Sequence, residues 1–72
     1  MPSWKEWLDE ANKAAASLAS LKEMQDEFQE QYDNMSEKAQ EGERGTRLAA
    51  LQDIDIDSAI GVVDEILGAE KP

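Results

Sequence analysis

Residues 4–35 read WKEWLDEANKAAASLASLKEMQDEFQEQYDNM and set the architecture of this 72-residue chain. Alternating steps of three and four residues meet an apolar or aromatic side chain at nine of ten positions, with Gln25 as the exception: Trp4, Trp7, Ala11, Ala14, Leu18, Leu21, Phe28, Tyr32 and Met35. This seven-residue repeat is typical of one long helix that packs against a partner helix. About thirty residues make a rod of roughly 45 Å, so the rest of the chain must cover its apolar stripe.

The ends of this helix can be read from its flanking residues. Ser3 with Glu6 forms a capping box that predicts a start at Trp4, and Asp33-Asn34 is a good turn pair that predicts an end near residue 34. We expect residues 35–42 to form the connecting turn, with a single helical turn opening at Ser36. Gln25 is expected to lie at the edge of the helix and to reach water.

A second helix is predicted over residues 43–67, with Gly42 before it and Gly68 as its C-cap. Wound at 100° per residue, its apolar side chains fall within one half of the circumference: Leu48, Ala49, Leu51, Ile56, Ala59, Ile60, Val62, Val63, Ile66 and Leu67. Two polar residues, Gln52 and Asp55, lie inside that half, and Ile54 lies outside it. Residues 69–72 are expected to fray.

An apolar face that covers half of a helix is too wide for one partner helix. We therefore predict an all-α fold, an antiparallel two-helix hairpin of residues 4–34 and 43–67 in one domain, 1–72. Two hairpins are expected to pair as a homodimeric four-helix bundle. The alternative is a single hairpin whose exposed face binds a different protein. The expected partner or dimer interface comprises Trp4, Trp7, Phe28, Tyr32, Ile56, Ile60, Val63 and Leu67; the two tryptophans fit either core anchors or a recognition surface.

Composition excludes several kinds of chemistry. The chain has no cysteine and no histidine, which removes disulfides and the usual ligands and bases of zinc and triad enzymes. We expect no enzyme activity and no cofactor. The N-terminus has no apolar run of a secretory signal, and no stretch is apolar enough to span a membrane, so a cytoplasmic protein is expected.

The net charge of −10 is concentrated in residues 23–43, which carry eight acids and one base. This sign disfavours direct binding to nucleic acid or to an anionic membrane and favours a basic partner protein. The expected partner-binding acidic face comprises Glu23, Asp26, Glu27, Glu30, Asp33 and Glu37.

Residues 53–64 allow two other interpretations. Acids at the first, third, fifth and twelfth positions are spaced like a calcium loop, although Ser58 stands where glycine makes the sharp turn and Asp64 where glutamate is usual. The alternation Asp-Ile-Asp-Ile-Asp also fits a short strand. Because Asp55 falls in the apolar half, it is expected at the dimer edge in water, or paired with a base such as Arg44, Arg47 or a lysine of a neighbouring helix.

Residues 31–48, QYDNMSEKAQEGERGTRL, resemble a pattern found in small acidic helical-hairpin proteins of phages and mobile elements. The pattern is an aromatic residue, Asp-Asn, a hydrophobic residue, Pro-Glu, two residues, Gln, and then Ser-Glu-Arg-Gly. Here Ser36 replaces the proline and Gly42 replaces the serine. The resemblance implies a helix–turn–helix hairpin and a phage context, and it implies no catalytic residues.

Together these features predict a non-enzymatic acidic interaction protein. In a phage setting its concrete form is an inhibitor or nucleic-acid mimic that binds a host or phage protein. The alternatives are a structural bundle used in assembly, in which Trp4 and Trp7 matter most, and a calcium-binding module at residues 53–64.

Overall fold

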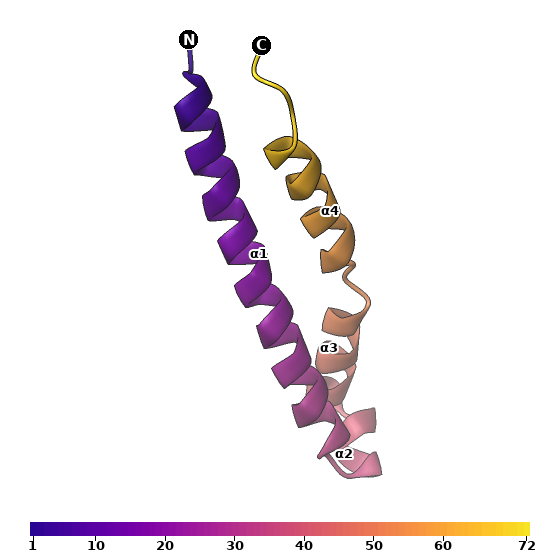
Figure 1. The fold of residues 1–72 in the computed structure, drawn as a ribbon. Coiled ribbons are helices and arrows are strands. Elements are labelled where there is room, and N and C mark those ends of the chain that lie inside the picture. Colours follow the sequence, from indigo (N-terminus) through magenta and orange to yellow (C-terminus); the bar gives the residue numbers. More distant parts are fainter.

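The computed structural model describes all of residues 1–72 and contains four helices and no strand. α1 (Trp4–Asp33) runs the length of the molecule, α2 (Glu37–Glu41) lies in the turn, and α3 (Glu43–Gln52) and α4 (Ile56–Leu67) return along α1. Figure 1 shows both termini at the same end. Because α1 packs against both α3 and α4, the chain is a hairpin, and the predicted all-α class is confirmed. It measures 55 × 18 × 15 Å.

Side-chain caps start the first two helices where the sequence predicts them. The Ser3 hydroxyl accepts a hydrogen bond from the amide of Glu6 (3.1 Å), and the Ser36 hydroxyl accepts one from the amide of Ala39 (3.2 Å). Each cap satisfies an amide that has no partner inside its helix. The short helical turn expected after Ser36 is therefore present, as α2.

The second helix predicted over 43–67 is present as two helices, because the chain leaves the helical conformation between α3 and α4. The Asp55 carboxylate accepts hydrogen bonds from the amide of Ser58 (3.1 Å) and from its hydroxyl, and so caps a new helix. The interruption removes Asp55 from the apolar half where a continuous helix would place it. The predicted apolar face is also not buried as a whole. Leu48 and Val63 are buried, whereas Leu51 and Val62 are exposed.

Gln25, on α1, binds the backbone of this break, and the expectation that Gln25 reaches water is wrong. Only 7% of Gln25 is exposed. Its Nε2 donates to the carbonyl oxygens of Leu51 (2.8 Å) and Ile54 (3.0 Å), and the Nε2 of Gln52 donates back to the carbonyl of Gln25 (3.1 Å). Lys22 completes the cluster, with its Nζ 3.4 Å from Oε1 of Gln25 and 3.3 Å from Oδ2 of Asp57.

Side-chain donors also bond to carbonyl oxygens at the ends of α1 and α4. The last carbonyls of a helix accept no hydrogen bond from within it, and none of α1, α3 and α4 has a basic residue in its last turn that could donate one. Instead, Nε2 of Gln40 donates to the carbonyl of Tyr32 at the end of α1 (2.9 Å), and Nε1 of Trp7 donates to that of Ile66 at the end of α4 (3.2 Å). Side chains from neighbouring elements thus tie the hairpin together at three levels.

The close approach of the first turn of α3 to α2 requires a glycine at position 45. A Cβ there would lie 2.2 Å from the carbonyl oxygen of Gln40, closer than real side-chain contacts come. Arg44 adds a hydrogen bond across the turn to Oε1 of Gln31 (3.1 Å). Together these residues build the connection between α1 and α3.

Candidate functional site

The predicted apolar stripe of α1 divides into two columns with different surroundings. The column at positions 4, 11, 18, 25 and 32 is buried or half-buried. In the column at 7, 14, 21, 28 and 35, the first three residues are exposed. The second arm of the hairpin therefore covers one column and leaves much of the other open. With exposed Ser17 and Met24, this column forms a continuous band along α1, here named the open stripe: Trp7, Ala14, Ser17, Leu21, Met24 and Phe28.

A groove deepens the open stripe beside the break between α3 and α4. Leu21, Met24 and Phe28 form one side of this break groove, which encloses about 220 Å³, and its remaining lining is Gln25, Leu51, Ile54 and Ile56. Four of the seven large hydrophobic side chains that are exposed in the chain lie in it: Leu21, Met24, Leu51 and Ile54. Clustered exposure of this kind makes the break groove a candidate interaction surface, which scattered apolar residues would not.

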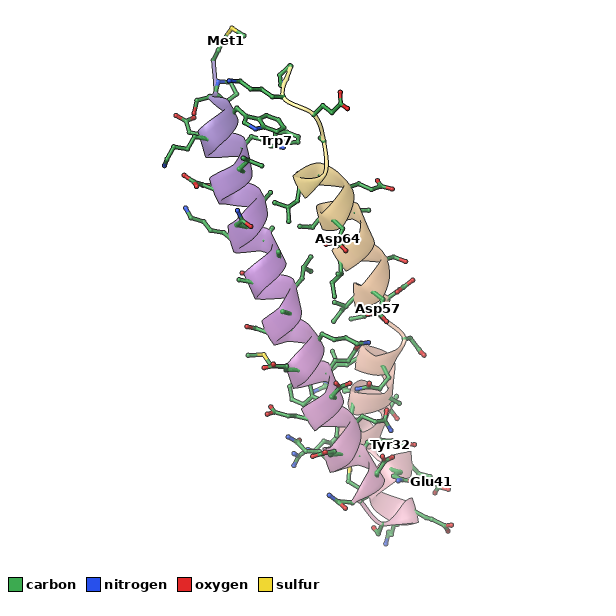
Figure 2. The ribbon with its side chains drawn as sticks, viewed as in Figure 1. Met1, Trp7, Tyr32, Glu41, Asp57 and Asp64 are labelled. Carbon is green, nitrogen blue, oxygen red and sulfur yellow. The ribbon has the colours of Figure 1, made fainter.

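A second groove, of about 420 Å³, lies at the N-terminal end of the stripe and is lined by Pro2, Glu6, Trp7, Glu10, Ala11, Ala14 and Ile66. The rings of Trp4 and Trp7 stack here, with centroids 6.2 Å apart and planes 12° from parallel. Figure 2 shows Trp7 between α1 and the end of α4. Trp7 remains 44% exposed although its indole N–H is bonded, so its ring still offers apolar surface.

The predicted acidic face is exposed along its whole length. None of its six carboxylates takes part in an ion pair; the ion pairs of the chain join Lys5–Asp9, Lys13–Glu10, Lys22–Asp57 and Arg47–Glu43. Within the face, Asp33 accepts a hydrogen bond from Gln29 (2.9 Å). At 100° per residue, Glu23, Glu27 and Glu30 lie on the side of α1 that faces away from α3 and α4. No ion pair within the chain therefore neutralises the charge of this face.

The residues predicted for the interface differ in accessibility. Trp7 is exposed, Val63 is buried inside the hairpin, and the other six are half-buried: Trp4, Phe28, Tyr32, Ile56, Ile60 and Leu67. Val63 therefore serves packing within the chain. Of these residues, the open stripe and the break groove include Trp7, Phe28 and Ile56, while the exposed Leu21, Met24 and Ile54 were not among those predicted.

Asp55 is exposed and has a structural task that its predicted position does not suggest. The hydrogen bonds from Ser58 lower the pKa of the Asp55 carboxyl, and the positive charge of Lys22 adds to that effect. The lowered pKa favours the ionised form of this carboxyl, which also interacts favourably with the positive end of the α4 dipole. The expectation that Asp55 reaches water is confirmed. Its hydrogen-bond partner is Ser58, and the base that acts on it is a lysine of the neighbouring α1, Lys22, and not Arg44 or Arg47.

Residues 53–64 do not form the calcium loop or the strand considered for them. Asp57 and Asp64 both lie on α4, seven residues apart, which is about 10 Å along the helix axis (Figure 2). No three Asp or Glu side chains of the chain lie close enough together to hold one metal ion. None of the four helices combines the length and apolar character needed to cross a bilayer.

Comparison of the chain with protein-family models, with curated proteins and with solved structures finds no match. Its function is therefore inferred from its own residues.

Proposed function

We propose that this chain is a non-enzymatic interaction protein. Two hairpins pair as a homodimeric four-helix bundle, and the acidic face of each binds a basic protein. The observation that carries the proposal is the open stripe, an apolar surface along α1 that the second arm of the same chain leaves uncovered.

The size of the uncovered surface supports pairing. The chain exposes 5704 Å², whereas a folded monomer of 8.0 kDa exposes about 4,450 Å². Its radius of gyration is 17.0 Å, against about 11 Å for a compact chain of this length. Two copies that each covered the excess would bury about 2,500 Å², which lies within the range of stable homodimers.

The acidic face supports a basic partner. Five of its carboxylates, from Glu23 to Asp33, occupy about 15 Å of helix, or roughly one charge per 3–4 Å. One strand of DNA carries a phosphate about every 3.4 Å. A linear array of this density, with no basic residue paired to it, can occupy a groove that normally holds nucleic acid. In a phage setting, the proposed form is an inhibitor of a host protein that binds nucleic acid.

A structural role in assembly is the second candidate, and the tryptophan pair favours it. Trp7 is large, half-exposed and beside a groove, which is where interface hot spots form. In this case the aromatic end of the hairpin, and not its acidic face, contacts the larger assembly.

In the first step of the experiment, the chain captures proteins from a bacterial lysate at low salt, and the retained protein is identified. In the second step, that protein is purified and bound to a labelled DNA duplex, and the complex is titrated with the chain. The acidic-face proposal expects the chain to displace the duplex, with affinity that falls as salt rises. Glu27→Lys/Glu30→Lys should abolish displacement. Glu65→Lys/Glu70→Lys changes the net charge equally, outside the acidic face, and should retain most of it.

Equal loss in both double variants would reduce the effect to net charge and refute the acidic face as the site. Retention that survives high salt but is lost in Trp7→Ala would favour the assembly role.

A further inference from the structure

We propose that a second copy of this chain packs antiparallel along the open stripe, with α1 crossing its symmetry mate between Ser17 and Leu21. This inference rests on the pairing proposed above and adds its face, orientation and register.

The spacing of the open stripe suits a helix of the same length. Its members recur every three or four residues from Trp7 to Phe28, with Glu10 filling the remaining step. This is the spacing that presents one continuous seam to a neighbouring helix. The stripe covers about 30 Å of α1, and a second α1 offers a seam of equal length and the same chemistry. A two-fold axis makes such a surface complementary to itself.

The sizes of the side chains select an antiparallel register. After the large Trp7 at its start, the stripe is small at Ala14 and Ser17, and it is bulky in its second half, at Leu21, Met24 and Phe28. A parallel pair would set bulky against bulky and small against small. An antiparallel pair that crosses between Ser17 and Leu21 sets Ala14 against the partner's Met24, and Ser17 against the partner's Leu21, so large side chains meet small ones.

Charge selects the same orientation. Residues 1–22 have equal numbers of acids and bases, whereas residues 23–43 carry a net −7. A parallel pair would align the two acidic halves, but an antiparallel pair places each beside the neutral half of its partner. Lys13 then lies on the flank of the seam within reach of the partner's Glu27. In the single chain this lysine pairs only with the adjacent Glu10 (3.1 Å), and its side chain is 74% exposed.

The arrangement determines how the acidic faces are presented. Each face is centred near Phe28, about nine residues from the crossing, so the two faces lie roughly 27 Å apart along the bundle and at opposite ends. The pair therefore offers two equivalent acidic sites, each with space for its own basic partner molecule.

The chain has no cysteine, so single cysteines can report the orientation. Ala14→Cys and Met24→Cys, one of them carrying a size tag, are mixed and oxidised. The antiparallel pair is expected to give the mixed disulfide and little of either homodimeric one, because identical positions would be about 15 Å apart. Light scattering of the unmodified chain should give the mass of two chains at micromolar concentration.

Leu21→Glu should shift the mass to one chain without loss of helical circular dichroism, because Leu21 is exposed in the single hairpin. Ala19→Glu adds the same charge on the other side of α1 and should leave the pair intact.

The outcomes separate the two proposals. A single-chain mass at all concentrations overturns both the four-helix bundle and this inference. A two-chain mass with homodimeric disulfides, or with none, leaves the bundle and overturns the antiparallel stripe. A mass above two chains also overturns the closed two-fold pair.

Discussion

Changing Gln25 to glutamate tests whether one buried side-chain amide on α1 holds α3 and α4 against α1 at the break between them. Gln25→Glu preserves the shape of the side chain but replaces the donor that bonds to the carbonyls of Leu51 (2.8 Å) and Ile54 (3.0 Å) with a carboxylate oxygen. Two lost hydrogen bonds cost about 1–3 kcal/mol. The introduced negative charge, buried beside two carbonyl oxygens, costs about 1 kcal/mol or more in addition, and its attraction to the Lys22 ammonium group offsets part of that cost.

We therefore expect the free energy of unfolding to fall by about 2–3 kcal/mol at neutral pH. A chain of this length has a total of about 4–11 kcal/mol, so the loss is a large fraction. The measurement is urea unfolding followed by helical circular dichroism, at one protein concentration for all variants. Hydrogen exchange at residues 53–56 should accelerate, because the break loses its anchor on α1.

Acid should reverse part of this loss. The introduced carboxyl is buried and faces acceptors, so its folded-state pKa lies above its unfolded value. The resulting destabilisation is present above the folded-state pKa and fades as the pH falls through it, when the protonated carboxyl can donate one hydrogen bond. Gln29→Glu adds the same charge one turn along α1, where Gln29 bonds only to Asp33, and should cost less than about 1 kcal/mol. Equal losses in the two variants, or no pH dependence at Gln25, would refute the role assigned to this amide.

Three further predictions concern the turn, the break and the pairing. Gly45→Ala should lower the free energy of unfolding by about 2 kcal/mol or more, because its Cβ would lie 2.2 Å from the carbonyl oxygen of Gln40. Gly61→Ala, where no atom lies within 4 Å, should raise it by about 0.5–1 kcal/mol; urea unfolding of both variants compares them. Asp55→Asn should lower the melting temperature at neutral pH, and the gap from the parent should close as the pH falls through the lowered pKa of Asp55, since the ionised carboxylate caps α4 more strongly than a neutral group does. Added salt should strengthen pairing of the acidic hairpins while it weakens binding of a basic partner, as light scattering and titration along one salt series would show.

Local rules were sufficient to predict most of the helical architecture. The seven-residue repeat of residues 4–35 identified α1, and Ser3 and Ser36 marked two helix starts, because periodicity and capping depend on neighbours within a few residues. The break between α3 and α4 also left a sign in the sequence. Gln52 and Asp55 fell inside an apolar half-circle, and those two residues make the polar contacts of the break.

Tertiary contacts settled the rest. A glutamine at a seam position has the same local pattern whether it reaches water or bonds to carbonyls 26 and 29 residues away, so only the packed arm shows that Gln25 is buried. Likewise, the repeat predicts an apolar stripe without saying which column the second arm covers. Which column is covered depends on the side of α1 along which α3 and α4 pack, and the break between them changes which of their side chains face α1. The packing leaves much of the surface from Trp7 to Phe28 exposed.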